Sequence, residues 1–315
     1  MQKLPLIAVM AVFLAAGCVG QPNPNPTTGS GLEITSFTSD IAEQYSGRTV
    51  RLLADFENDG ESTVDMLKSL VWLDGPIVAA GTGSSLQWQL ESGKTQAFAF
   101  IKNLVPRDPV RDTLPGTAST SWKLTAPQLD AGQRKTDTFR LRAYYDYETK
   151  SVGEMVAYTE AESSAIKERG DQLETSAFSN TVGPVAISTR VLPDPVTLYS
   201  TDADSFELAT LEITISNVGG GTIYGNNIIT SSTPSPSLKF ENLNKVTLTI
   251  TTALEQSGTG CGGEQELISG KPTTITCDYK VKASDVSTSK HFPVKVVADY
   301  GYYTEKDVEV TALGK

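Results

Sequence analysis

The feature that most constrains the fold of this chain is an internal repeat. The segment FRLRAYYDYET at 139–149 has a counterpart, VKVVADYGYYT at 294–304, displaced by 294 − 139 = 155 residues. In both copies an apolar or aromatic residue occupies nearly every second position, which indicates a strand with one buried face. A strand pattern that occurs twice predicts that one structural unit is present twice.

Two further blocks repeat in the same order. Leu52 in VRLLADFENDGESTV aligns with Leu211 in TLEITISNVGGGTI, an offset of 211 − 52 = 159, and an Asn-x-Gly turn signal ends each strand. LESGKTQAFAF at 90–100 aligns with LISGKPTTITC at 267–277, an offset of 267 − 90 = 177. Ordered blocks with changing offsets indicate a duplicated module with different loop insertions.

Each module consists of short alternating segments between Gly, Pro, Ser and Asn turns, with little helix. This pattern predicts an all-β fold of two tandem antiparallel β-sandwiches, at 32–188 and 189–315. The segment STRVLPDPV at 188–196 is then a stiff linker. The boundary can lie anywhere between Pro184 and Pro195.

The first module carries two predicted insertions, at 103–137 and 151–175. The second insertion has the only helical pattern of the mature chain, with Met155, Val156, Tyr158 and Ile166 as an apolar stripe. Two interpretations stay open: the helix caps an open end of the sandwich, or it docks a partner.

Both modules combine Asn-x-Gly with a Leu-x-x-Gly turn and a closing strand. The residues are Asn58 to Gly60 with Leu90 to Gly93, and Asn217 to Gly219 with Leu267 to Gly270. This combination resembles immunoglobulin-like modules of the CARDB type, which occur in tandem on archaeal and bacterial surface proteins. The resemblance implies an immunoglobulin-like fold at a cell surface, and a fold of this kind does not specify an activity.

The N-terminus has the form of a lipoprotein signal peptide. A lysine precedes an apolar run that is short for a membrane span, and LAAGC follows it. LAAGC resembles a lipobox, which implies cleavage after residues 1–17 and lipid on Cys18, with 18–31 as a Pro/Gly/Thr-rich tether. The alternative is an ordinary secretory signal.

With Cys18 assigned to the anchor, Cys261 and Cys277 remain, 277 − 261 = 16 residues apart. In an exported protein such a pair is expected to form a disulfide, which would stabilise the second module by roughly 3 kcal/mol. A metal site is the alternative, but His291 is the single histidine and could complete no ligand set.

The repeated tyrosines are interpreted as framework. Tyr145 and Tyr147 recur as Tyr300 and Tyr302, and a residue needed twice at one strand position suggests packing rather than binding. We expect all four in the core near a strand end, with their hydroxyls on polar partners. The unshared Tyr144 and Asp146 point the other way and are candidates for external contact.

The composition argues against several functions. A net charge of −11 and a pI near 4.7 argue against nucleic acid as a partner. No phosphate loop, Gly-x-Ser-x-Gly elbow or histidine-based metal site is present, so we expect no catalytic residues, metal or cofactor. A carboxylate pair for glycoside hydrolysis leaves no spacing signature. The segment DADSFE at 202–207 suits either calcium or a solvated loop.

These observations predict a non-enzymatic, membrane-anchored surface lipoprotein. It would serve as a structural, adhesion or protein-interaction module, with an envelope protein or surface polymer as partner. The alternative is a ligand-binding lipoprotein, for carbohydrate or as an accessory of a transport or secretion complex. A carbohydrate binder needs Trp or Tyr on a flat outer face, whereas an adhesin can use sheet edges.

Overall fold

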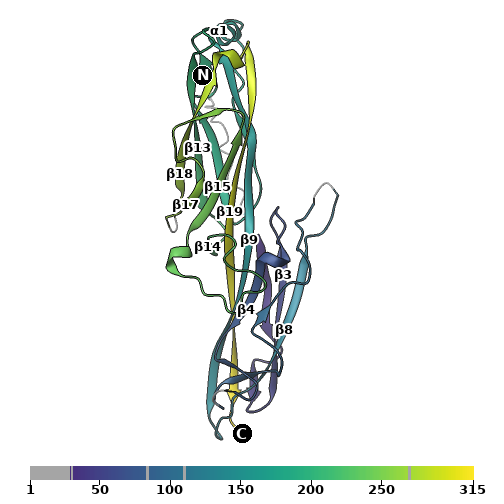
Figure 1. Cartoon of the computed structure of the whole chain (residues 1–315). Helices are drawn as coiled ribbons and strands as arrows, with labels where there is room; N and C mark the ends of the chain where they lie inside the picture. The colour runs from purple at the N-terminus through teal and green to yellow at the C-terminus, as the bar shows by residue number, and fades with distance from the viewer. Residues whose placement is uncertain (1–28, 30, 83–84, 109–110, 269–270) are drawn as a thin grey trace, which may run out of the picture.

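The computed structural model describes residues 29, 31–82, 85–108, 111–268 and 271–315. These residues form an elongated, mostly β-stranded molecule (Figure 1). Cys18, the signal peptide predicted at 1–17 and nearly all of the tether predicted at 18–31 lie outside the described residues. The all-β class expected from the sequence is confirmed.

The strands fall into two runs that each end in a very long strand. The first run is β1 (Leu32–Ser39), β2 (Glu43–Tyr45), β3 (Thr49–Asn58), β4 (Ser69–Asp74), β5 (Ile77–Ala79), β6 (Trp88–Leu90), β7 (Ala97–Phe98), β8 (Thr117–Thr125) and β9 (Arg134–Thr159). The helix α1 (Glu160–Glu168) follows. The second run is β10 (Ala177–Asn180), β11 (Val185–Leu192), β12 (Val196–Leu198), β13 (Phe206–Asn217), β14 (Thr222–Tyr224), β15 (Lys245–Thr252), β16 (Glu255–Ser257), β17 (Gly263–Glu266), β18 (Thr273–Lys282) and β19 (Ser289–Leu313).

The two long strands form one antiparallel ribbon. β9 and β19 pair from Ser289 opposite Tyr158 to Leu313 opposite Arg134. Figure 1 shows them side by side along the length of the molecule. At the centre of the ribbon Asp146 lies opposite Gly301, and 301 − 146 = 155 is also the offset of the repeat. A pseudo-twofold axis therefore passes through this pair and relates the two copies of the unit.

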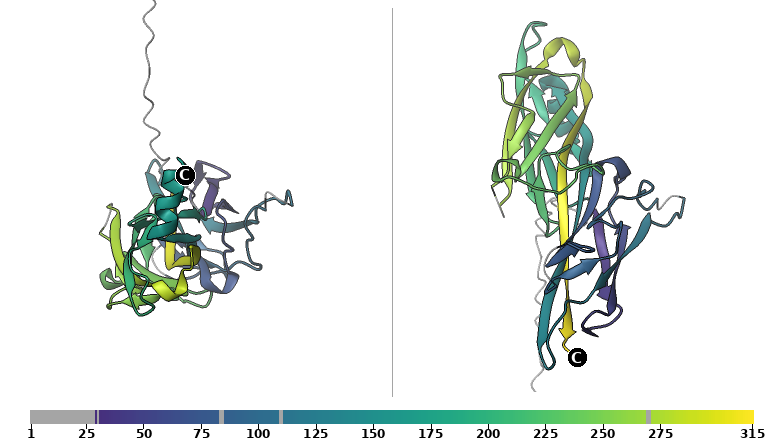
Figure 2. Two further views of the ribbon diagram at one scale, coloured as in Figure 1. Left: turned by 90° about the horizontal axis from the view of Figure 1, so that it is seen from above. Right: turned by 60° about the horizontal axis from the view of Figure 1, so that its bottom comes forward.

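The ribbon is the middle of a ten-stranded sheet that both halves share. Its order is β17-β15-β19-β9-β4-β7, with β2, β10, β12 and β14 at the margins. A five-stranded sheet, β1-β3-β8-β6-β5, covers one half of the ribbon, and a four-stranded sheet, β11-β13-β18-β16, covers the other. Figure 2 shows the two small sheets at opposite ends of the ribbon. Each half is therefore built on one part of β9 and one part of β19.

One continuous hydrophobic core joins the three sheets. Trp88 of β6 packs edge to face on Phe139 of β9, with ring centroids 5.4 Å apart. In the other half Thr189 of β11 donates a hydrogen bond to Ser151 of β9 at 2.9 Å. The alternating residues of β9 and β19 that the sequence placed on one face line this core.

The predicted division into two consecutive modules is wrong in its boundaries. The boundary at 188/189 falls inside β11, and the proposed linker at 188–196 is the end of β11, a turn and the start of β12. The half formed by residues 32–125 also contains the C-terminal part of β19. A repeat in sequence does not determine whether each copy keeps its long strand or shares it with the other copy.

The two predicted insertions are also corrected. The range 103–137 contains β8, which pairs with β3 along Thr117–Thr125, and the start of β9. In the range 151–175, residues up to Thr159 continue β9, and only Glu160–Glu168 are α-helical. The helical prediction was wrong because Met155, Val156 and Tyr158 belong to a part of β9 that is buried on both faces. Such a strand lacks the alternation of apolar and polar residues by which a strand is recognised.

The third aligned block is not structurally equivalent. Phe98 lies in β7 and pairs with β4 in the large sheet, whereas its aligned residue Ile275 lies in β18 of a small sheet. The true counterpart of Cys277 is Trp122, because Trp122 is paired with Leu52 and Cys277 with Leu211. A shared Ser-Gly-Lys turn had brought unrelated strands into alignment.

The shared ribbon predicts that the two halves unfold together. All three tryptophans, Trp72, Trp88 and Trp122, lie in the first half, and the Cys261–Cys277 disulfide lies in the second. Replacing both cysteines by serine should lower stability by roughly 3 kcal/mol and shift the thermal transition followed by tryptophan fluorescence. A far-ultraviolet circular dichroism melt should shift equally. A tryptophan transition that does not move would show that the halves unfold independently.

Candidate functional site

The waist of the molecule is built around the pseudo-twofold axis. On the core face, Tyr145, Tyr147, Tyr300 and Tyr302 are all buried and contact one another. The ring centroids of Tyr145 and Tyr302, which are paired across the ribbon, lie 5.8 Å apart. The expected framework role agrees with this burial, but the tyrosines lie at the middle of the long strands and not near a strand end.

The tyrosine hydroxyls fasten loops of both halves to the ribbon. The Tyr147 hydroxyl accepts a hydrogen bond from the Ser62 N–H at 2.9 Å. The Tyr302 hydroxyl donates to Asn217 Oδ1 at 3.0 Å and accepts from the Gly221 N–H at 2.6 Å. These residues belong to the two Asn-x-Gly turns, so the turns and the tyrosines of the repeat form one contact.

The opposite face of the waist is covered as well. Tyr144 is buried beneath Tyr224 and Tyr303, with ring centroids 6.3 Å and 5.2 Å away. Tyr224 comes from β14, and the following loop covers the ribbon with Ile229. The sequence suggested Tyr144 as a residue for external contact. This prediction is wrong, because an element of the second half packs over Tyr144.

Beside this cover lies a polar hollow of about 410 Å³. It lies at the pseudo-twofold axis, where Asp146 forms part of its wall, and carboxylates and lysines dominate its lining. Its charged residues are Glu61, Asp65, Lys68, Asp146, Glu148, Lys150 and Asp299. Among the described residues, no group of three or more histidine, cysteine, aspartate or glutamate side chains could hold a metal ion. The hollow is therefore a charged surface feature without a metal-ligand set.

Asp146 is the carboxylate of this hollow with the most perturbed surroundings. Its Oδ2 accepts a hydrogen bond from the Asn227 N–H at 2.8 Å, while its Oδ1 is buried and has no hydrogen-bond partner among the described residues. Burial raises the pKa of Asp146 to about 6, although the Asn227 hydrogen bond opposes this shift. Burial and the neighbouring Glu148 also raise the pKa of Asp299.

The other candidate residues lie apart from the waist. His291 of β19 is partly exposed, and its Nδ1 lies 2.9 Å from Glu154 Oε2, in agreement with a surface position. In the segment at 202–207, Asp202 Oδ1 accepts from the Asp204 N–H at 3.2 Å, and the Ser205 hydroxyl donates to the Asp202 carbonyl at 2.6 Å. Residues 202–205 form a turn, and β13 begins at Phe206.

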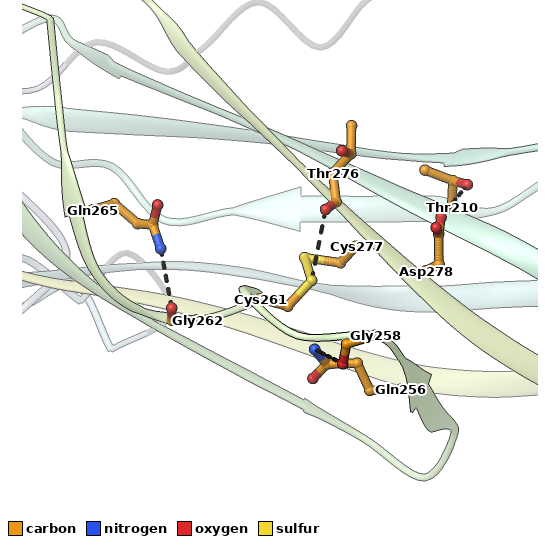
Figure 3. Close-up of a disulfide and its surroundings, with 9 residues drawn as sticks. All are labelled: Thr210, Gln256, Gly258, Cys261, Gly262, Gln265, Thr276, Cys277 and Asp278. Carbon is orange, nitrogen blue, oxygen red and sulfur yellow. Dashed lines mark hydrogen bonds between the residues drawn. A yellow bond between two sulfur atoms is a disulfide. The ribbon is translucent and has the colours of Figure 1, made fainter.

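Cys261 and Cys277 form a disulfide, with Cα atoms 5.5 Å apart. Figure 3 shows how it holds the loop after β16 against β18, where Cys261 Sγ lies 3.6 Å from the Thr276 carbonyl oxygen. Cys18 lies outside the described residues.

The helix α1 lies at the end of the molecule that is remote from the C-terminus (Figure 1). Thr159 caps it by accepting a hydrogen bond from the Glu162 N–H, and Ser163 is its buried residue. Its position at this end fits the capping interpretation, and its exposed residues, among them Ser164 and Lys167, are available for contact. Both interpretations made from the sequence are compatible with this position.

A groove of about 550 Å³ along β8 was not anticipated. The residues that line it belong to β3, β7, β8 and the turn before β7: Arg51, Glu91, Gly93, Lys94, Thr95, Ala97, Phe98, Thr120, Ser121, Trp122 and Lys123. The sequence offered one signal, the alternation of small and polar residues in TASTSWK. The segment lies within the insertion predicted at 103–137.

The comparisons with known proteins add no identification. No protein-family model and no curated protein match the chain. Among solved structures, the collagen binding domain of Erysipelothrix rhusiopathiae surface protein RspB aligns over 91% of this chain and 98% of its own, at 8% identity and a TM-score of 0.12. A TM-score this low carries no argument about fold or function.

The buried Asp146 predicts a pH-dependent stability. The Asp146 carboxyl holds its proton more tightly in the folded chain than in the unfolded chain, where its pKa is near 3.8. The free energy of unfolding should therefore fall as pH rises from about 4 to about 6. Asp146→Asn keeps an acceptor for Asn227 and should flatten this slope, with a gain of about 1 to 2 kcal/mol at neutral pH.

Urea unfolding at several pH values measures this effect. Asp204→Asn, in an exposed turn, is the matched control and should leave the slope unchanged. Equal slopes for the wild type and Asp146→Asn would show that Asp146 does not titrate differently in the folded chain.

Proposed function

We propose that this chain is a non-catalytic cell-surface lipoprotein that acts as a structural, adhesion or protein-interaction module. The observation that carries the proposal is the β9–β19 ribbon, which joins both halves into one elongated body through a single register. Such a body can hold binding surfaces at fixed separations, which suits a scaffold. Its partner would be an envelope protein or a surface polymer.

The proposed anchor is a lipid on Cys18, supported by the LAAGC sequence and the short apolar run before it. The first described strand, β1, begins near the waist, where Gly31 lies against Tyr145 and Pro184. A tether that enters at the waist would leave both ends of the molecule free for contact. Among the residues that the structure describes, no helix is long and apolar enough to cross a membrane.

The finer fold assignment belongs to this proposal. We assign each half to an immunoglobulin-like, CARDB-like unit of prokaryotic surface proteins, on the Asn-x-Gly turn that ends β3 and β13 in the two halves. The two units would have arisen by duplication, followed by sharing of their long strands. The equivalent pairing of Leu52 with Trp122 and of Leu211 with Cys277 supports the duplication.

The positions of the aromatic residues favour this proposal over carbohydrate binding. A carbohydrate platform needs tryptophan or tyrosine side chains together on an exposed flat face. Trp88 and Trp122 are buried in the core, and Trp72 is partly buried, with its Nε1 donating to Asp74 at 2.9 Å. Among the exposed aromatics, Tyr199 follows β12 and Phe240 lies between β14 and β15.

The anchor is tested with Cys18→Ser. We expect the wild type in the membrane fraction and Cys18→Ser in the soluble or secreted fraction, because a lipid chain supplies the membrane affinity. Metabolic labelling with a radioactive fatty acid should mark the wild type alone. Cys261→Ser controls for loss of a cysteine as such. Retention of Cys18→Ser in the membrane would contradict the proposed anchor.

The interaction role is tested by cross-linking an affinity-tagged full chain on intact cells. The control is an unrelated soluble domain carried on residues 1–31. We expect envelope proteins or polymer fragments that are enriched with the full chain over this control. Equal recovery from both would contradict the proposed role.

The same experiment separates the two interpretations of α1. The variant Ser164→Arg/Lys167→Glu changes its exposed face and leaves the buried Ser163 in place. If α1 docks the partner, recovery falls in this variant. If α1 is a cap, recovery is unchanged.

A further inference from the structure

The strand β8 has one open edge. On one side it pairs with β3 from Thr117 to Thr125. On the other side β6 covers only its C-terminal end, at Leu124 and Thr125. Residues 117–122 therefore have no neighbouring strand on that side among the described residues.

The register identifies the groups that face this edge. The Lys123 carbonyl accepts a hydrogen bond from the Glu91 N–H, so the backbone polar groups of Lys123 point away from β3. Because these groups alternate along an antiparallel strand, the N–H and C=O groups of Ser121 and Ser119 also point to the open edge. No described residue bonds these backbone groups across the edge.

The groove of about 550 Å³ runs beside this edge and carries an excess of positive charge. Lys123 lies 3.5 Å from Glu91, whereas Arg51 and Lys94 have no carboxylate within ion-pair distance among the described residues. A cationic groove on a chain with a net charge of −11 is a local exception. It complements an acidic ligand.

The second half provides an internal comparison. Thr276 of β18 occupies the position of Ser121, because Cys277 corresponds to Trp122. There the loop that carries Cys261 is fixed by the disulfide, and Cys261 Sγ lies 3.6 Å from the Thr276 carbonyl. The corresponding edge is thus covered as far as Thr276, while the edge at Ser121 is not.

We propose that the open edge of β8 binds an extended acidic segment of a partner protein, which adds to the sheet as a further strand. Main-chain hydrogen bonds to Ser119 and Ser121 hold the segment, and Arg51 and Lys94 select acidic side chains. A second copy of the chain is the less favourable occupant. A symmetric edge-to-edge contact would bring the cations of both grooves together. This inference rests on the proposed interaction role and names the surface that performs it.

The test is a selection from a random peptide display library on the immobilised full chain in detergent. We expect acidic peptides with alternating side chains to be enriched, and synthetic copies of them to slow hydrogen exchange at the Ser119 and Ser121 amides. Ser121→Pro removes an edge-facing N–H that β3 does not use, and should weaken binding about tenfold. Ser121→Thr keeps this N–H and should bind like the wild type.

Lys94→Glu tests the charge of the groove without changing a strand, and it should also weaken binding of the acidic peptides. This variant keeps the proposal testable if Ser121→Pro fails to fold. The proposal is overturned if the enriched peptides are not acidic, or if they bind Lys94→Glu as tightly as the wild type without protecting the two amides. It is also overturned if sedimentation shows a dimer that Ser121→Pro dissociates, because the occupant is then a second copy. If folded Ser121→Pro recovers the same cross-linked envelope partners as the wild type, the edge is not the surface they use, while the proposed interaction role stands.

Discussion

The antiparallel pairing of β9 with β19 is the contact on which the rest of the structure depends. Every residue of β19 has a partner in β9, and the alternating residues of one ribbon face enter the core that both halves share. A slip by one residue would turn all of these side chains to the other face. Three of the four waist tyrosines oppose such a slip, because the hydroxyls of Tyr147, Tyr300 and Tyr302 accept hydrogen bonds from backbone N–H groups of both halves.

The pseudo-twofold axis also explains why the repeat breaks at its centre. Asp146 and Gly301 occupy equivalent positions in the two copies and lie opposite each other. A Cβ at residue 301 would lie 2.0 Å from the Tyr224 ring, so the ring occupies the space of that side chain. Gly301 therefore lies beneath the Tyr224 ring, whereas Asp146 keeps a carboxylate beside the polar hollow.

The sequence was sufficient for the fold class and for the duplicated strands, because alternation and turn signals are local. The shared ribbon could not be predicted, since a strand that stays in its own half and one that crosses into the other have the same pattern. Val156 and Tyr158 misled the assignment of 151–175 because they are buried together with Met155 and Ala157, so β9 is buried on both faces there. Tyr144 misled the site prediction because Tyr224, far away in sequence, covers it.

The difference between the halves at β8 and β18 is informative because their framework is the same. An open strand edge risks unwanted pairing, and proteins usually cover such edges or place charges on them. The second half covers its edge with a loop that the disulfide fixes to β18. In the first half the loop after β6 pairs no further than Lys123, and the cations Arg51 and Lys94 line the groove instead. Like charges discourage a second copy and attract an acidic chain, so this half prevents self-pairing without closing the edge.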